Sequence, residues 1–253
     1  MKALASFYHT FKFWMVISVL SLVLGVAALI LAAVRRNGDG PHRIASLWSR
    51  LLCRLNGIPV EIIGLENVQR DRAQIFVANH QGYFDIFALS GYLPVQIRWM
   101  AKASLFRIPF VGWSMKAAGY IPVQRDNKKK AFQSFLDTIE KIKAGCSVVL
   151  FPEGTRSENG IIGPFKKGGH LLAARSGAPM VPVTILGTGA IIRKGSAVIR
   201  PGAVRIIISP PVDVERCGPD GVEQALVGIR ETIIRNYEEN RLGKSAGFLE
   251  ARE

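Results

Sequence analysis

The longest apolar run in the chain extends from Phe13 to Val34 and ends at Arg35 and Arg36. A helix of this length reaches about 33 Å, which is enough to cross a hydrocarbon core of about 30 Å. The apolar region of a secretory signal peptide is shorter, about 7–15 residues. The run therefore favours a membrane helix, which either spans the bilayer or dips into it.

A second helix is predicted after a turn at residues 37–41. Between His42 and Leu55, apolar residues recur at helical spacing and arginines stand between them. This pattern is typical of a basic amphipathic helix at a membrane surface, with Trp48 as an aromatic anchor, and it also fits an ordinary helix packed on a core. We expect residues 1–56 to form a membrane-associated helical hairpin.

From Pro59 onward, short apolar runs alternate with helical patterns. The predicted strands are Val60–Ile63, Ile75–Ala78, Ile97–Lys102, Tyr120–Val123, Ser147–Phe151, Met180–Leu186 and Val204–Ser209. The predicted helices run from about Ile86 to Gly91, from Pro109 to Ala118, and over Lys128–Lys143, Phe165–Ser176 and Asp220–Tyr237. This alternation predicts an α/β domain over residues 57–243, with a mixed, mostly parallel sheet flanked by helices. We expect residues 244–253 to be a loose tail.

A polar motif stands where the second predicted strand ends. The strand runs into Asn79-His80-Gln81-Gly82-Tyr83-Phe84-Asp85, and a helical pattern follows. An imidazole with an ordinary pKa of about 6.5 is mostly free base at neutral pH, and a carboxylate on its other nitrogen fixes the tautomer. His80 and Asp85 therefore form a candidate catalytic pair. The same pair also fits a structural role, with Asp85 in the first turn of a helix.

Three polar residues with ionisable side chains directly follow predicted strands: His80, Arg125 and Glu153. Ligands of open α/β sheets bind beyond the carboxyl ends of the strands. We therefore expect these side chains to converge at one edge of the sheet.

The composition indicates an anionic partner. The chain has 253 residues, of which 49% are hydrophobic, and a formal net charge of +14. Such a length suits one domain plus an appendage. The charge points to nucleic acid, an anionic membrane surface or a phosphorylated substrate. The chain has no stacking-aromatic or helix-turn-helix signature, and its N-terminal run is apolar, so we expect no nucleic-acid partner.

The cysteines and histidines give no sign of a metal centre. Cys53, Cys146 and Cys217 are widely spaced without a C-x-x-C motif, and the four histidines form no cluster with ligand spacing. This pattern argues against a disulfide framework and a zinc site. We expect a reducing compartment and no metal.

Four motifs occur in order along the chain: Asn79–Asp85, Gly119–Arg125, Phe151–Ser157 and Val181–Val183. Together they resemble the 1-acylglycerol-3-phosphate acyltransferase (lysophosphatidate acyltransferase) family. The resemblance extends from about Ile58 to Pro211, and the string Phe-Pro-Glu-Gly-Thr-Arg is its most specific part. In the second motif this chain reads Ile-Pro-Val-Gln-Arg, where the family usually has Phe-Ile-x-Arg.

The resemblance implies a glycerolipid acyltransferase fold and transfer of an acyl group from a thioester to an alcohol. His80 would take the alcohol's proton while Asp85 orients the ring. The chain contains no Gly-x-Ser-x-Gly elbow, which favours direct attack by the acceptor over an acyl-enzyme. Backbone N–H groups at Gly154 and its neighbour Thr155 are candidates for positioning the substrate and holding the oxyanion.

The acceptor's phosphate requires positive charge. Arg156 is the first candidate because a guanidinium pairs bidentately with phosphate. Arg125 is the second, and Lys102, which matches a basic residue of the family between the first two motifs, is the third. Glu153 has three open roles: positioning Arg156, bonding to an acceptor hydroxyl, or capping the following turn. The run Phe165–Gly169 fits either contact with the donor's phosphates or a solvated helix start.

The leading hypothesis is a membrane-bound enzyme that moves a fatty acyl group to the sn-2 hydroxyl of 1-acylglycerol-3-phosphate. The product would be phosphatidic acid in phospholipid biosynthesis, with acyl-CoA or acyl-carrier protein as co-substrate and no cofactor. The alternatives are the same reaction on another lysolipid, including an amino-acid-headed one, and a non-catalytic membrane-binding protein. If the first helix spans, the arginines that follow it place the domain on the cytoplasmic side of the inner membrane.

Overall fold

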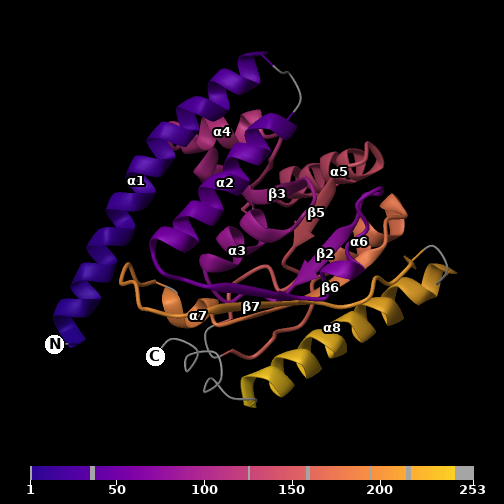
Figure 1. The fold of residues 1–253 in the computed structure, drawn as a ribbon. Coiled ribbons are helices and arrows are strands. Elements are labelled where there is room, and N and C mark those ends of the chain that lie inside the picture. The colour runs from indigo at the N-terminus through magenta and orange to yellow at the C-terminus, as the bar shows by residue number, and fades with distance from the viewer. Residues whose placement is uncertain are drawn as a thin grey trace.

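The computed structural model describes residues 2–34, 38–124, 126–157, 160–193, 195–214 and 218–242. A sheet with the strand order β1-β7-β6-β2-β5-β3-β4 forms the centre of this part of the chain (Figure 1). The strands are β1 Val60–Ile63, β2 Ile75–Ala78, β3 Ile97–Lys102, β4 Ile121–Val123, β5 Ser147–Leu150, β6 Met180–Leu186 and β7 Val204–Ile208. Neighbouring strands are parallel except for β6 and β7. The predicted mixed, mostly parallel sheet is confirmed.

Helices cover both faces of this sheet. They are α1 Lys2–Val34, α2 Asp39–Leu55, α3 Phe84–Tyr92, α4 Val111–Ala117, α5 Lys128–Lys143, α6 Lys167–Ser176, α7 Thr188–Ile191 and α8 Gly218–Leu242. Two 3₁₀ turns, η1 Leu65–Asn67 and η2 Ala103–Arg107, complete the fold. In Figure 1, α1, α2 and α3 lie on one side of the sheet, and α8 lies on the other.

The side chains on the two faces of the central strands pack into two separate hydrophobic cores. Phe76 and Ala78 of β2 join the core under α2 and α3, whereas Ile75 and Val77 join the core under α5, α6 and α8. All four residues are fully buried. Successive strand residues point to opposite faces. A strand buried on both faces therefore reads as a continuous apolar run, which is why its sequence predicted it well.

The N-terminal hairpin is part of the first core. Phe13 of α1 is 1% exposed and its ring centroid lies 5.7 Å from that of Phe84 in α3. Leu52 and Cys53 of α2 are fully buried in the same core. Burying side chains of this size stabilises the fold by about 1.5–3 kcal/mol each. The hairpin and the sheet therefore share a core across the predicted boundary at residue 56.

A buried polar network also joins α2 to the sheet. His42 hydrogen-bonds through Nδ1 to the Tyr120 hydroxyl at 2.8 Å and accepts the Ile97 N–H at Nε2. Arg98, at the start of β3, pairs with Asp39 at 2.5 Å. Burial, together with the Arg98 charge, lowers the pKa of His42 from 6.5 to about 3. His42 is therefore a neutral structural residue that ties the hairpin to β3 and β4.

Some helix boundaries differ from the prediction. The predicted helix Phe165–Ser176 begins at Lys167, because the Lys166 N–H bonds to the Pro152 carbonyl at 2.9 Å and holds the preceding residues extended. The first helix begins at Lys2 rather than Phe13, since residues 2–12 continue the same helix. The closing helix also extends beyond the predicted Asp220–Tyr237 at both ends.

Candidate active site

His80 and Asp85 form a hydrogen-bonded pair at the carboxyl end of β2. The His80 Nδ1–H donates to Asp85 Oδ2 at 2.6 Å, and the Asp85 side chain is 0% exposed. The same carboxylate oxygen accepts the backbone N–H groups of Gln81 at 2.7 Å and Gly82 at 3.0 Å. Asp85 lies in the first turn of α3, where the positive end of the helix favours a carboxylate. The catalytic and structural roles proposed for this pair are therefore compatible.

The carboxylate fixes the tautomer of the His80 ring. Because Asp85 accepts from Nδ1, the lone pair of the neutral ring lies on Nε2. Nε2 makes no hydrogen bond within the described ranges, and the His80 side chain is 17% exposed. This nitrogen is thus placed to accept a proton from a molecule outside the protein.

The backbone of His80 is held from both sides by the loop that follows β5. The His80 N–H donates to Glu153 Oε1 at 2.8 Å, and the His80 carbonyl accepts the Ser157 N–H at 2.8 Å. The motif that contains His80 and the motif that contains Glu153 are therefore bonded at two points. The position of the histidine is set by both.

Glu153 uses both carboxylate oxygens for this purpose. Its Oε2 accepts the Gly163 N–H at 2.9 Å, and the residue is 6% exposed. Three roles were open for Glu153: positioning Arg156, bonding to an acceptor hydroxyl, or capping the following turn. Its contacts with backbone N–H groups resemble the third role most. Within the described ranges, the side chains of Glu153 and Arg156 make no hydrogen bond or ion pair with each other.

Phe151 forms one wall of the site. Its ring stacks on the His80 imidazole, with centroids 4.1 Å apart and an interplanar angle of 13°. Trp99 lies behind Phe151, with centroids 5.9 Å apart, and its indole N–H donates to Ser90 Oγ at 2.8 Å. This series of rings restricts the imidazole to one plane and keeps water from one of its faces.

The Arg156 side chain packs against Tyr83, a residue that follows His80 by three positions in the sequence. The guanidinium carbon is 4.0 Å from the Tyr83 ring centroid, a cation–π geometry, and Nη2 is 3.4 Å from the hydroxyl. Arg156 Nη1 is buried and makes no hydrogen bond. Leaving a buried guanidinium N–H without an acceptor costs free energy.

Lys102 lies at the carboxyl end of β3, which neighbours β5, and its side chain is exposed. Arg125 follows β4, the next strand along, but falls outside the described residues. The strand order β2-β5-β3-β4 places His80, the Glu153–Arg156 loop and Lys102 along the carboxyl edge of the sheet. Of the three residues expected to converge there, His80 and Glu153 are in contact, and Arg125 lies outside the described residues.

Gly154 has a different role from the one expected. Its N–H donates to the Phe151 carbonyl at 3.0 Å, so this N–H belongs to a turn and is not available to an oxyanion. Its φ of 70° favours glycine, and an added Cβ would lie 2.8 Å from Lys166 Nζ. The next residue, Thr155, is exposed. Lys166 belongs to the run Phe165–Gly169, for which either contact with the donor's phosphates or a solvated helix start was expected. Its side chain lies next to the loop that contains Gly154.

No role was predicted for Asn79, Tyr83 or Phe151, although all three lie within the motifs. The Asn79 side chain is fully buried and bonds Ile185 twice, accepting its N–H at 2.7 Å and donating to its carbonyl at 2.8 Å. It thereby joins the end of β2 to β6. The signal available in the sequence was a polar amide directly after a buried strand, which predicts a hydrogen-bonded side chain.

No group of three His, Cys, Asp or Glu side chains within the described ranges could hold a metal ion. The fold and the site together are those of an α/β enzyme with a His–Asp pair and an unpaired guanidinium N–H at the carboxyl edge of its sheet.

Residues 59–186 match the acyltransferase family, and the chain belongs to that family. It is 36% identical over 205 residues to a chloroplastic 1-acyl-sn-glycerol-3-phosphate acyltransferase of Brassica napus, covering 76% of this chain and 59% of that protein. It is 27% identical over 221 residues to the 1-acyl-sn-glycerol-3-phosphate acyltransferase of Pseudomonas aeruginosa, covering 85% of each. The resemblance inferred from the four motifs is confirmed.

A solved structure has the same architecture. The crystal structure of the 1-acyl-sn-glycerophosphate acyltransferase of Thermotoga maritima matches this chain with a TM-score of 0.85 at 28% identity, covering 96% of this chain and 98% of that one. This match confirms the predicted fold class.

Proposed function

We propose that this protein transfers a fatty acyl group to the sn-2 hydroxyl of 1-acylglycerol-3-phosphate and so forms phosphatidic acid for phospholipid biosynthesis. The observation that carries the proposal is the hydrogen bond from His80 Nδ1 to Asp85, which leaves Nε2 of His80 without a partner in the described ranges. The names of the relatives support the same acceptor.

The proposed reaction needs a base and a route for the leaving group. The sn-2 hydroxyl gives its proton to His80 Nε2 as its oxygen attacks the thioester carbonyl carbon. Asp85 stabilises the imidazolium that forms. The tetrahedral intermediate then collapses, the C–S bond breaks, and the thiolate takes the proton from the imidazolium. The donor is a thioester of CoA or of acyl-carrier protein, and both satisfy this scheme.

In this scheme Arg156 holds the phosphate of the acceptor. Tyr83 supports one face of the guanidinium and orients it. Nη1 then has a partner in a phosphate oxygen, which removes the cost of leaving it unpaired. Lys102 and Arg125 remain further candidates for the same phosphate. The oxyanion is assigned to the N–H groups of Thr155 and Arg156, which make no backbone–backbone hydrogen bond within the described ranges.

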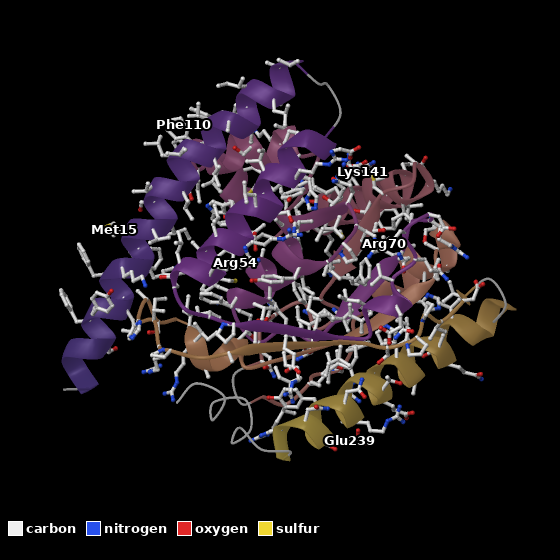
Figure 2. All side chains as sticks on the ribbon, in the orientation of Figure 1. Met15, Arg54, Arg70, Phe110, Lys141 and Glu239 are labelled. Atoms are coloured by element: carbon white, nitrogen blue, oxygen red, sulfur yellow. The ribbon has the colours of Figure 1, made fainter. Side chains whose placement is uncertain are left out.

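The membrane attachment is assigned to α1. Residues Ser6–Val34 are long and apolar enough to cross a membrane, with a mean hydropathy of 2.8. The outer side of α1, where Met15 is labelled in Figure 2, bears exposed apolar side chains. They are Phe7, Phe11, Met15, Val19, Leu22, Val23, Val26 and Ile30.

The inner side of α1 contacts the globular domain along its length. Near the N-terminus, Trp14 donates from its indole N–H to the Ala197 carbonyl at 3.0 Å. In the C-terminal third of α1, Ser114 of α4 donates to the Gly25 carbonyl at 3.3 Å, and Phe110 lies beside α1 in Figure 2. If α1 crossed the bilayer, it would carry this polar domain into hydrocarbon. We therefore propose that α1 lies in one leaflet with its outer face in lipid.

With α1 in one leaflet, the positive-inside rule no longer determines which side of the membrane carries the domain. The proposed location remains the cytoplasmic face of the inner membrane, because the acyl thioester donors must reach the active site from that side. The basic residues of α2 would then face an anionic membrane surface.

A lysolipid-by-donor panel with the purified full chain tests this function. The acceptors are lysophosphatidic acid, another lysophospholipid, an amino-acid-headed lysolipid and monoacylglycerol, each with acyl-CoA and with acyl-carrier protein thioester. We expect the highest kcat/KM with lysophosphatidic acid and background turnover for His80→Ala. A preference for another acceptor would overturn the proposed substrate, and turnover absent with every pair would overturn the activity.

A further inference from the structure

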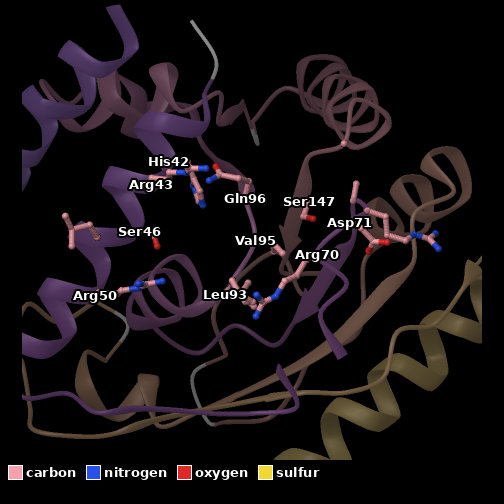
Figure 3. A pocket seen from close by; sticks show the side chains of 15 residues that line it. His42, Arg43, Ser46, Arg50, Arg70, Asp71, Leu93, Val95, Gln96 and Ser147 are labelled. Atoms are coloured by element: carbon pink, nitrogen blue, oxygen red, sulfur yellow. The ribbon is translucent and has the colours of Figure 1, made fainter. Parts of the chain in front are cut away.

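A basic groove lies outside the candidate active site, between α2 and the loops that lead into β2, β3 and β5 (Figure 3). Its volume is about 620 Å³. Residues 70–73 of its lining precede β2, and residues 93–96 precede β3. The groove is therefore at the amino edge of the sheet, whereas His80 is at the carboxyl edge. Four residues of β2 separate the two edges by about 13 Å.

Four arginines line this groove from two segments that are distant in sequence. Arg43 and Arg50 come from α2, two helical turns apart, and Arg70 and Arg72 come from the loop before β2. All four are exposed. In Figure 3 the side chains of Arg50 and Arg70 extend toward the space between these walls. Asp71 is the one acidic residue in the lining.

These arginines differ from the structural arginines of the chain. Arg98 is paired with Asp39, Arg205 with Glu61, and Arg230 with the carbonyls of residues 162 and 163. In the part of the chain that the structure describes, none of the four groove arginines forms an ion pair.

One of the four has a structural contact. The Arg50 Nε–H donates to the Gly91 carbonyl, which orients that guanidinium along the groove. The side chains of Arg43, Arg70 and Arg72 make no hydrogen bond within the described ranges. Guanidinium groups that share a concave surface repel one another, and a polyanion between them removes that repulsion.

We propose that this groove binds a polyanionic ligand whose phosphate groups carry two or more negative charges. This site is separate from the catalytic centre. Guanidinium groups pair with phosphate bidentately, and several of them around a cavity select a polyanion over a single charge. This chemistry is shared by soluble organophosphates and by the headgroups of anionic phospholipids. The proposal does not depend on the acceptor assigned to the active site.

The test uses the full chain in neutral detergent with Arg156→Ala, which removes the proposed phosphate contact of the active site. Pyrophosphate is the soluble probe, titrated by calorimetry. The lipid probe is cardiolipin, whose headgroup carries two phosphates, in detergent micelles, with phosphatidylcholine as the zwitterionic reference. Arg70→Gln/Arg72→Gln removes two charges from the groove. Arg175→Gln/Arg241→Gln removes two charges from α6 and α8 and is the matched control.

We expect the Kd of the groove variant for at least one probe to rise by about tenfold or more. The Kd of the control should change by less than about twofold at equal salt. Ser46→Glu keeps every arginine and places a carboxylate in the lining, so it should weaken the same binding without loss of folded protein. Binding of pyrophosphate identifies a soluble ligand, and a preference for cardiolipin over phosphatidylcholine identifies a lipid. No binding of either probe, or equal loss in the two double variants, would overturn the proposal.

Discussion

The Glu153 carboxylate accepts the backbone N–H of His80 at 2.8 Å. It therefore joins the loop after β5 to the histidine after β2. Its other oxygen accepts the Gly163 N–H at 2.9 Å, so the same side chain also holds the far end of its own loop. A buried acid in the most specific motif of this chain is thus a positioning residue that acts through the backbone.

The first prediction concerns Glu153→Gln. A carboxamide has one acceptor oxygen, and its NH₂ group would face a backbone N–H that needs an acceptor. We expect the free energy of unfolding to fall by about 1–3 kcal/mol, because one buried N–H loses its partner, and we expect kcat to fall with it. Denaturant unfolding and steady-state kinetics measure the two effects. Glu66→Gln, on the exposed turn η1, is the control. Unchanged stability and kcat would show that these contacts do not position His80.

The second prediction concerns Arg156→Ala. If Arg156 holds the acceptor's phosphate, kcat/KM should fall about ten- to a hundredfold with lysophosphatidic acid, because a charge-assisted contact contributes about 1.5–3 kcal/mol. The loss should shrink with monoacylglycerol, which has no phosphate. Arg156→Lys should restore part of the rate, since an ammonium cannot make the planar two-point contact. An equal loss with both acceptors would instead assign the phosphate to Lys102 or Arg125.

The third prediction concerns the membrane topology of α1. We expect the full chain, added to preformed vesicles, to bind with both ends on the outside. A protease-cleavable tag before Met1 and another after Glu253 should therefore be cut completely by external protease. Contacts such as Trp14 with Ala197 hold α1 along the domain and favour this arrangement. Protection of the N-terminal tag until detergent is added would show that α1 spans the bilayer.

The fourth prediction concerns pH and His42. The pKa of this buried ring is lowered to about 3 in the folded protein, against 6.5 for the ordinary side chain. Between these values the unfolded chain binds the proton and the folded chain does not, so stability is full above about pH 6.5 and falls as pH decreases toward 3. The slope contributed by this residue approaches 1.36 kcal/mol per pH unit, an order-of-magnitude value.

We expect His42→Gln to have a shallower loss of stability than the unmodified protein over this range, measured by denaturant unfolding at each pH. His170→Gln, which leaves the α2 network intact, should keep the original slope. Identical slopes for the unmodified protein and His42→Gln would contradict the assignment of a neutral, buried His42.

Much of the fold follows from local pattern. The strand Ile75–Ala78 was predicted with its observed bounds because a strand buried on both faces must be apolar at every position. The His80–Asp85 pair was also predictable, since both residues lie within one strand–helix junction. The antiparallel pairing of β6 with β7 and the position of β1 beside β7 depend on long-range packing, and the local pattern does not encode them.

The contacts that support the site were less predictable. Glu153 bonds backbone N–H groups of residues far along the chain, and any residue type could supply those N–H groups. The stacking of Phe151 on His80 requires that β2 and β5 be neighbours, which the strand order alone reveals. Arg98 lies within a predicted strand, and nothing in the local pattern indicated a partner for it. In the structure it is 3% exposed and paired with Asp39 of the hairpin.

The central claim is that His80 Nε2 takes the proton of the acceptor hydroxyl. Its most direct test is the kcat of His80→Ala in the full chain, with acyl-CoA and lysophosphatidic acid as substrates and with folding verified by the melting temperature. His170→Ala is the matched histidine control. The account predicts a loss of about 10²–10⁴-fold for His80→Ala and near-normal turnover for the control. A folded His80→Ala protein that keeps near-normal kcat would contradict it.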